Sequence, residues 1–503
     1  MKVLAVTSEF FPFAKTGGLA DVTGALPKAL SNLGVSTSTL LPGYGTVLER
    51  LERVLVPVAE MNLLSEPVTL KKARSGAGEI IVLDAPTLFH RAGGPYSDEN
   101  GQDFGDNWKR FAVLSLAGAE IARGALPGWK PDVVHVHDWQ AALTPVYMRH
   151  RGCGIPTVLT VHNLAFQGQF DASLLPFLDL PASHYRTELM EYYGGISYLK
   201  GGLLHADAIT TVSPTYAREI LTPRFGMGMD GVLRTRRDDL LGIVNGVDEE
   251  VWDPTTDPYL PYNYGATNPR QKEKNKKILL QRLGLDTDPG PLFGVVSRLT
   301  WQKGMDLLAA AAHDFLSKGG KLVICGRGDR AIEQRLESLA RAHPGRMSVY
   351  IGYEEHLAHL IHGSADAIIQ PSRFEPCGLT QLYALRYGSV PIVSRTGGLS
   401  ETVIDANVAA LSARVATGFQ FHPVTVEALR HALNRALHAY GDSNRWARLR
   451  GQAMKARFSW DRSAREYASL YERLAGTTIG QATTDVRTSE PPLSRRSARR
   501  LAR

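Results

Sequence analysis

The hydrophobic positions of this chain fall into short apolar runs that alternate with longer segments in which apolar residues recur at helical spacing. In the first half, this pattern predicts strands at residues 2–7, 37–41, 80–83, 133–136, 157–161 and 208–212, with helices such as 20–33 and 108–123 between them. A stretch rich in Pro and Tyr, Trp252 to Tyr264, then interrupts the pattern. The chain therefore divides near its middle.

After that interruption the alternation starts again. The second half predicts strands at residues 293–296, 321–325, 348–351, 367–370 and 390–393, with helices at 305–318, 331–342 and 378–386. Strands that alternate with helices indicate a parallel sheet with helices on both faces, here once per half. We therefore predict an α/β protein with two doubly wound domains, residues 1–243 and 244–457, facing a central cleft.

A repeated glycine pair gives each half a candidate binding loop. The first predicted strand leads into Lys15-Thr16-Gly17-Gly18-Leu19, which opens a helix. Bare backbone N–H groups at such a turn can approach a phosphate, and Lys15 adds a point charge. The sequence Thr-Gly-Gly-Leu occurs again at 396–399, also after an apolar strand. Both halves are thus predicted to present a glycine pair to an anion.

Composition places the chain among soluble globular enzymes. It has 503 residues, of which 44% are hydrophobic and 21% charged, enough for two large domains. No run approaches the roughly 20 apolar residues that span a bilayer, and no signal-peptide pattern precedes the first strand. The spacing of Cys153, Cys325 and Cys377 fits neither a disulfide framework nor a zinc site. We expect a cytoplasmic protein without a membrane partner.

The net charge of +7 is concentrated at the C-terminus. Residues 477–503 hold six arginines and two acidic residues, so only +3 remains for the other 476 residues. That small excess does not favour a nucleic-acid partner. The composition of 477–503 predicts a disordered basic tail, and a tether for an anionic partner is the alternative.

Five polar clusters fall at the ends of predicted strands, where parallel sheets bind ligands. They are the Lys15 loop, His135 to Trp139, Thr160 to Asn163, Ser297 to Gly304 and Ser372 to Gln381. Arg298 and Lys303 suit a pyrophosphate, although a solvated surface pair is the alternative. His135 and His137 share one strand face and could form a metal pair, but no third ligand is apparent. Hydrogen bonding at the strand end, or a role for Asp138, is favoured.

Other residues of these clusters also allow a purely structural interpretation. His162-Asn163 alone is compatible with a local turn, and Glu375 before Pro376 is compatible with a helix cap. In that case the neighbours Gly378, Leu379 and Thr380 would offer free N–H groups to an anion. The pair Asp286 and Asp288, which could suggest a divalent metal, lies in a predicted turn and is read as loop.

Together these clusters resemble bacterial glycogen synthase and plant starch synthase. Lys15 to Leu19, His137 to Trp139, Thr160 to Asn163, Ser213 to Ala217, Asn245 to Asp248, Ser297 to Gly304 and Ser372 to Gln381 occur in the expected order. The resemblance covers Met1 to about Leu474. It implies two Rossmann-like domains of the GT-B type, with a returning helix at 458–476. It also implies retaining transfer of glucose from ADP-glucose to the non-reducing end of an α-1,4-glucan, without a cofactor or metal; the oligomeric state is left open.

The resemblance also implies roles for individual residues. Lys15, Arg298 and Lys303 would bind the diphosphate, while Gly17, Gly18, Gly378, Leu379 and Thr380 would contact phosphate and sugar, with Cys377 in the same donor-binding run. His162, Asn163, Asn245 and Glu375 would hold the glucosyl unit, and Asp138 would lie on the acceptor side. Tyr353 would stack on adenine, and Asp21 would touch the nucleoside. The expected catalytic set is Glu375, His162, Asp138, Arg298 and Lys303.

One position departs from related transferases, which carry a glutamate eight residues after the equivalent of Glu375. Here that position is Tyr383, as in starch-synthase-like sequences, so ribose binding there is not implied. Competing hypotheses are a nucleotide-sugar epimerase or a phosphorylase-like enzyme on the same fold, and a glucan-binding protein without catalysis. UDP-glucose is the alternative donor.

Overall fold

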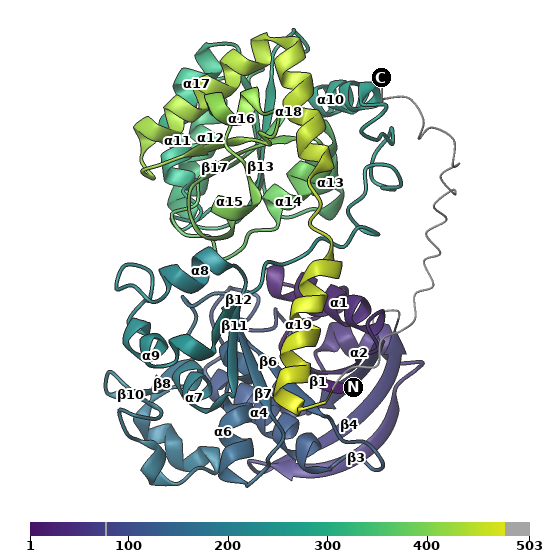
Figure 1. Cartoon of the computed structure of the whole chain (residues 1–503), viewed down its shortest axis with the longest axis vertical. Helices are drawn as coiled ribbons and strands as arrows, with labels where there is room; N and C mark the ends of the chain where they lie inside the picture. The colour runs from purple at the N-terminus through teal and green to yellow at the C-terminus, as the bar shows by residue number, and fades with distance from the viewer. Residues whose placement is uncertain (76–77, 478–503) are drawn as a thin grey trace, which may run out of the picture.

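The computed structural model describes residues 1–75 and 78–477, so the tail predicted at 477–503 lies almost wholly outside the described residues. Two lobes are stacked along the long axis, and each is built on its own sheet (Figure 1). The first half of the chain forms the lower lobe in that view. The second half forms the upper lobe, and helix α19 (Trp460–Ala475) returns to the lower one.

The sheet of the first lobe has nine strands. Its order is β12 (Leu240–Gly242), β11 (Ala208–Thr211), β7 (Thr157–Val161), β6 (Val133–His137), β1 (Lys2–Val6), β2 (Ser36–Pro42), β5 (Gly78–Asp84), β4 (Glu66–Ser75) and β3 (Val56–Leu63). The strands from β12 to β5 are parallel. All six predicted strands of this half are present.

The sheet of the second lobe has six parallel strands. Its order is β15 (Met347–Ile351), β14 (Lys321–Gly326), β13 (Leu292–Val296), β16 (Ala367–Gln370), β17 (Val390–Ser394) and β18 (Phe419–Phe421). Numbered within the lobe, this is the order 3-2-1-4-5-6 of the doubly wound dinucleotide-binding fold. The predicted fold class is confirmed.

The prediction of purely parallel sheets was wrong at one edge. Strands β3 and β4 form an antiparallel hairpin that extends the first sheet beyond β5. A small antiparallel sheet, β8 (Gln169–Asp171), β10 (Gly195–Ser197) and β9 (Glu191–Tyr192), was also missed. Both lack the continuous apolar run of a strand buried on two faces. The edge strand β3 is largely exposed, and of residues 66–74 in its neighbour β4 only Val68, Leu70 and Ala73 are buried.

Helices cover both faces of each sheet. The first lobe carries α1 (Gly18–Ser31), α2 (Gly45–Leu51), α3 (Pro86–Phe89), α4 (Asn107–Arg123), α5 (Asp138–Ala141), α6 (Leu143–His150), α7 (Tyr198–His205), α8 (Pro214–Glu219) and α9 (Asp230–Thr235). The second carries α10 (Arg270–Arg282), α11 (Met305–Ser317), α12 (Arg330–Ala342), α13 (Glu355–Ser364), α14 (Thr380–Arg386), α15 (Gly397–Thr402), α16 (Val408–Ser412), α17 (Val426–Gly441) and α18 (Ser443–Lys455).

Side chains of β1 alternate between the two faces of the first sheet, and helix α19 covers one of these faces. Leu4 and Val6 pack into the large core that contains α4, whereas Val3 points to the opposite face. That second face is covered by α1 and α19 together, through apolar side chains that include Trp460, Tyr467, Leu470 and Tyr471. Helix α19 thus completes the core of the first lobe.

Two chain segments cross between the lobes side by side. The backbone N–H of Val247 donates to the carbonyl of Phe458 at 2.7 Å, and Val247 and Ser459 form a parallel bridge. A Cβ on Gly246 would lie 2.6 Å from Cα of Trp460, so this close crossing requires glycine. We propose that the domain boundaries expected at 243/244 and 457/458 correspond to this crossing.

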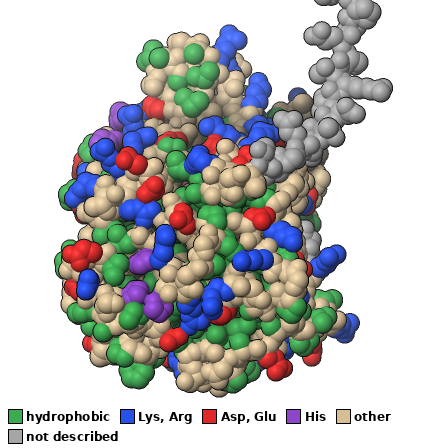
Figure 2. All heavy atoms as spheres, turned by 60° about the horizontal axis from the view of Figure 1, so that its bottom comes forward, with side chains coloured by type: hydrophobic (Ala, Val, Ile, Leu, Met, Phe, Trp, Pro, Cys, Tyr) green, Lys and Arg blue, Asp and Glu red, His purple; other side chains and the backbone are tan. Residues whose placement is uncertain are grey.

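The surface carries charges of both signs. On the face of the first lobe that Figure 2 turns forward, basic and acidic side chains are interspersed with apolar and polar ones. None of the helices within residues 1–75 and 78–477 combines the length and apolar character that a membrane crossing needs.

Candidate active site

The strand order of each sheet reverses at one point, and the predicted clusters lie there. In the first lobe, β2 and β6 flank β1; in the second, β14 and β16 flank β13. Ligands of such sheets bind at the carboxyl ends of the strands around this reversal. Lys15 and Asp138 follow β1 and β6, while Arg298 and Glu375 follow β13 and β16. The structure therefore brings four of the five clusters to two switch points, and the Thr160 cluster lies beside them on β7.

The two switch points face one another across the lobe boundary. A Cβ on Gly18 at the start of α1 would lie 3.5 Å from Cδ1 of Leu379 in the other lobe. Farther along the contact, Ser213 Oγ donates to the carbonyl of Pro376 at 2.7 Å. Residues that lie more than 150 positions apart in the chain thus line one interface.

The first glycine pair already holds an anion, the carboxylate of Glu9. The backbone N–H groups of Thr16 and Gly17 donate to Glu9 Oε2 at 2.7 and 3.2 Å, and Glu9 is only 3% exposed. Lys15 Nζ lies 2.8 Å from Asp21 Oδ1. Glu9, which the sequence analysis did not predict, thus occupies the Gly17 N–H group that was expected to contact a ligand phosphate.

The second glycine pair was interpreted wrongly as a second site for an anionic ligand. The N–H of Gly397 donates to Glu219 Oε1 of α8, in the other lobe, at 3.0 Å. Side chains at the pair would collide with the loop that follows β16: a Cβ on Gly397 would lie 1.8 Å from the Glu375 carbonyl, and one on Gly398 2.3 Å from that of Cys377. This pair allows close packing behind Glu375 and links the two lobes.

Asp138 occupies a strained, half-buried position at the end of β6. Its φ of 55° lies in the left-handed region, which non-glycine residues rarely adopt. Asp138 Oδ1 accepts the backbone N–H of His162 at 2.7 Å, joining the ends of β6 and β7. Burial raises the pKa of Asp138 to about 7, although hydrogen bonds from the His162 and Asn163 backbones oppose the shift. Strain and a shifted pKa at a strand end are typical of a functional residue.

The two histidines of β6 do not form a metal pair. His135 Nδ1 and Nε2 are hydrogen-bonded to the Tyr471 hydroxyl at 2.7 Å and the Thr160 hydroxyl at 2.6 Å. His137 Nδ1 lies 3.0 Å from Nε2 of His162. Within the described part of the chain, no group of three or more His, Cys, Asp or Glu side chains has an arrangement that could hold a metal ion.

In the second lobe, Glu375 forms a buried ion pair with Lys303. Glu375 is 4% exposed, and its carboxylate accepts from Lys303 Nζ at 2.6 and 2.8 Å, from Ser372 Oγ at 2.8 Å and from Gln370 Nε2 at 3.2 Å. Burial alone would raise the pKa of Glu375, but the Lys303 charge and these hydrogen bonds hold it below its ordinary value. Glu375 is therefore ionised, and it is not a simple helix cap.

Arg298 differs from the other two cations because it is uncompensated. Its side chain is exposed and has no hydrogen-bond or ion-pair partner within residues 1–75 and 78–477. Lys15 and Lys303 are each paired with a carboxylate. An anion entering the cleft would therefore meet Arg298 as a free guanidinium.

The remaining predicted residues of the second lobe surround this pair. Asn245 is 6% exposed, and its Oδ1 is buried without a hydrogen-bond partner in the described residues. Burial raises the pKa of Cys377 to about 12, against a backbone hydrogen bond from Asn245, so the thiol is neutral. Gly378 has a φ of 74°, and Leu379 and Thr380 lead into α14. Asn245 Oδ1, like Gln370 Oε1 beside Glu375, is thus a buried polar atom that a ligand could satisfy.

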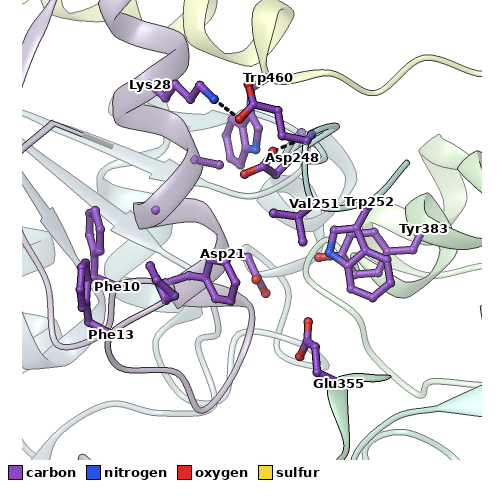
Figure 3. A pocket seen from close by; sticks show the side chains of 16 residues that line it. Phe10, Phe13, Asp21, Lys28, Asp248, Val251, Trp252, Glu355, Tyr383 and Trp460 are labelled. Atoms are coloured by element: carbon purple, nitrogen blue, oxygen red, sulfur yellow. Dashed lines mark hydrogen bonds and ion pairs between the residues drawn. The ribbon is translucent and has the colours of Figure 1, made fainter. Parts of the chain in front are cut away.

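A cavity of about 330 Å³ lies between the lobes, and Asp21 is the one predicted site residue among those that line it. Asp21 of α1 and Glu355 of α13 point into it from opposite sides (Figure 3). On the wall of this cavity the Tyr383 ring stacks on the Trp252 ring, with centroids 3.8 Å apart and an angle of 6° between the ring planes. Tyr383 is therefore a packing residue. The exposed ring of Tyr353 lies near by, with its hydroxyl hydrogen-bonded to Glu355. Sequence reasoning missed Glu355 and Trp252, which lie outside every motif.

Two doubly wound domains whose switch points face each other, with cations and buried polar groups on both edges, define a glycosyltransferase of the GT-B type. Residues 2–235 match the family described as the starch synthase catalytic domain, and residues 276–450 match glycosyl transferases group 1. Glycogen synthase 1 of Rhizobium meliloti is 56% identical over 94% of this chain and 99% of its own length. The chain belongs to the glycogen synthase family.

Two further relatives extend the comparison. The catalytic domain of starch synthase IV from Arabidopsis thaliana, solved with ADP and acarbose, is 32% identical and superimposes with a TM-score of 0.86 over 94% of this chain and 99% of its own. Glycogen synthase 2 of Agrobacterium fabrum is 54% identical over 100% of this chain and 98% of its own length. Because that alignment includes the C-terminal segment, the tail is not peculiar to this chain.

Proposed function

We propose that this enzyme transfers glucose from ADP-glucose to the non-reducing end of an α-1,4-glucan and retains the anomeric configuration. The relatives named as glycogen synthases and the starch synthase solved with ADP and acarbose support this donor and acceptor. The observation that carries the proposal is the grouping of free Arg298 with the buried Lys303–Glu375 pair at the second switch point.

The donor diphosphate would lie against the cations. Arg298 would bind it without losing another partner, whereas Lys15 would have to exchange Asp21 for a phosphate oxygen. Lys303 can serve the phosphate and Glu375 together, because an ammonium has three donors. The adenosine would extend toward Tyr353, and Asp21 and Glu355 would lie at its side.

The glucosyl unit would lie between Glu375 and the ends of β6 and β7. As its bond to the diphosphate breaks, positive charge grows on C1 and negative charge on the leaving oxygen. Arg298 and Lys303 stabilise the second charge, and ionised Glu375 stabilises the first or binds sugar hydroxyls. Asn245 Oδ1, buried and unpaired, would accept a sugar hydroxyl.

The acceptor would approach from the side of Asp138. Its O4 forms the new bond to C1 on the face that the diphosphate leaves, and its hydroxyl proton passes to the departing phosphate oxygen. The bond broken is C1–O(phosphate), the bond formed is C1–O4, and ADP leaves with the proton. Closure of the lobes would exclude water, which otherwise hydrolyses the donor.

A donor panel tests the proposal. The enzyme is incubated with glycogen and ADP-glucose, UDP-glucose or glucose 1-phosphate, and the release of nucleoside diphosphate or inorganic phosphate is measured. We expect the highest kcat/KM with ADP-glucose. A higher value with UDP-glucose would overturn the donor assignment, and phosphate release from glucose 1-phosphate would identify a phosphorylase.

A further inference from the structure

His137 lies one residue before Asp138 and touches the proposed sugar-binding histidine, yet no role in the reaction has been given to it. It is 2% exposed, and its Nδ1 lies 3.0 Å from Nε2 of His162. The two rings are 5.3 Å apart at an angle of 38°. Nδ1 of His162 has no hydrogen-bond partner in residues 1–75 and 78–477, so this contact is the only hydrogen bond that holds the His162 ring there.

Both histidines are neutral. Burial lowers the pKa of His162 to about 3; it also lowers the pKa of His137 well below its usual value, with the neighbouring His135 and His162 acting in the same direction. A contact between two neutral imidazoles needs one N–H and one bare nitrogen. The tautomer of His162 is therefore coupled to that of His137. If His137 carries its proton on Nδ1, then Nδ1 of His162 is a donor; if not, it is an acceptor.

The His137 ring is itself held from behind. The His135 ring packs on it with centroids 4.2 Å apart, and both nitrogens of His135 are hydrogen-bonded, one to Thr160 and one to Tyr471. Tyr471 belongs to α19, which enters the first lobe from the far end of the chain. A chain of side-chain contacts thus leads from Tyr471 of α19 through His135 and His137 of β6 to His162 at the end of β7.

We propose that His137 is a positioning residue, which fixes the orientation and tautomer of His162, and that His135 and Tyr471 of α19 support it. The catalytic part of this inference rests on the proposed glucosyl transfer; the tautomer coupling does not. Its chemical content is that His162 presents one defined group, a donor or an acceptor, to a sugar oxygen.

A double-mutant cycle tests the positioning role. His137→Leu should lower kcat about tenfold or more, as expected when a supporting hydrogen bond to a functional group is lost, with a smaller change in the donor KM. His137→Asn, whose amide can replace Nδ1 as donor or acceptor, should recover most of the activity. In a His162→Ala background, His137→Leu should have little further effect, because the group it positions is already gone.

A pair of tyrosines on one helix gives the matched control for the support from α19. Tyr471→Phe removes the hydroxyl bonded to His135 and should lower kcat severalfold. Tyr467→Phe should have a smaller effect on kcat. Phenylalanine keeps the ring that packs on His135 with centroids 5.4 Å apart, and the hydroxyl it removes is not bonded to His135. Equal losses in the two variants would remove Tyr471 from the arrangement.

A spectroscopic measurement is independent of activity. Long-range ¹H–¹⁵N spectra of the whole chain labelled at histidine should show a single neutral tautomer for His162 in the wild type and in His137→Asn, and a mixture in His137→Leu. An unchanged His162 tautomer in His137→Leu overturns the proposal, as does a kcat loss of equal size in both backgrounds. If the wild type transferred no glucose from ADP-glucose, the proposed function would fail, whereas these spectra would still decide the coupling.

Discussion

At the scale of single residues, the cleft holds its charged groups in pairs before any substrate arrives. Lys303 is bound to Glu375 and Lys15 to Asp21, and only Arg298 of the three proposed diphosphate cations is free in the described residues. The buried carboxylate of Glu375 is fixed by hydrogen bonds from Lys303, Ser372 and Gln370, so it need not reorient when charge develops on the sugar. Preorganisation of this kind is what makes fixed charges effective in a closed site.

Arg298→Ala and Lys303→Ala should each lower kcat by about 100-fold or more, in line with the loss of one preorganised electrostatic donor. Charge on the diphosphate grows as the bond breaks, so these cations act more strongly in the transition state than in binding. Steady-state kinetics with ADP-glucose separate the two. A change confined to KM would place both residues in ground-state binding.

Glu375→Gln should also abolish most of the transfer and lower the unfolding temperature, although glutamine keeps the shape and an acceptor oxygen. The change removes the charge that is proposed to face the sugar and leaves Lys303 without its buried counter-ion. Transfer rate and thermal unfolding are measured together. A near-normal rate would remove this carboxylate from the mechanism.

Asp138→Asn should raise the melting temperature and lower activity. Because burial raises the folded pKa of Asp138 from 3.8 to about 7, ionisation costs the folded state more than the unfolded state. The cost is absent below pH 3.8, grows as the pH rises toward 7 and is complete above it. Asparagine adopts the same left-handed backbone without a charge.

The measurement is thermal unfolding of wild type and Asp138→Asn at pH 5.5 and pH 8.5. The stabilisation by the substitution should be larger at pH 8.5. An equal difference at both values would show that Asp138 titrates normally in the folded protein.

At the scale of elements, the proposed site residues lie in loops that follow strands, and one helix, α19, completes the core of the first lobe. The loops after β1, β6, β13 and β16 bring the proposed residues to two edges, because parallel strands all end on the same side of a sheet. Helix α19 covers a sheet face of the first lobe although it follows the whole of the second. The first lobe therefore depends on the last described element of the chain.

Two truncations separate the helix from the tail. A chain that ends at Gly476 should fold and transfer glucose to soluble glucan at nearly the full rate. A chain that ends at Arg457 loses buried side chains including Trp460, Tyr467 and Tyr471, and each such loss costs about 1.5–3 kcal/mol. Their sum is comparable with the roughly 5–15 kcal/mol that stabilises a whole domain.

Soluble yield, unfolding temperature and transfer rate are compared for the two truncations. The chain ending at Arg457 should be insoluble or unfolded. Loss of activity in the chain ending at Gly476 would give the tail a structural or catalytic role.

At the scale of the whole molecule, two lobes contribute opposite sides of one site, and the charges they supply are those of side chains. Transfer should therefore proceed without a divalent metal, because Lys15, Arg298 and Lys303 can offset the charge of the leaving diphosphate. The acidic pair at 286 and 288 lies away from the cleft, and Asp288 is ion-paired with Lys321 and Arg346. Assays with excess EDTA and with added Mg²⁺ test this. Activity that EDTA abolishes and Mg²⁺ restores would sink the metal-free mechanism.

The sequence by itself determined the buried strands, the two α/β halves and the polar clusters at strand ends. Strands buried on both faces are mostly apolar, and polar residues follow directly where such a strand ends. These features leave local patterns, as at 133–138 and 367–375. The polar clusters at strand ends are visible in this local pattern, whereas the roles expected of residues such as Asn245 and Tyr353 rest on the family resemblance. The antiparallel hairpin β3–β4 was missed because its strands are not buried on both faces and so show no continuous apolar run.

Only the tertiary structure decided which polar groups pair with one another. The second glycine pair was read as an anion site, but the anion is Glu219 of the other lobe, 178 residues away. Likewise, His135 is held by Tyr471, and Glu375 by Lys303, across separations of 336 and 72 residues. The pattern of apolar and polar residues shows which side chains must be buried and which need a polar partner, because that need depends on each residue's own chemistry. The partner that satisfies it is set by how distant segments pack, and no local pattern encodes that.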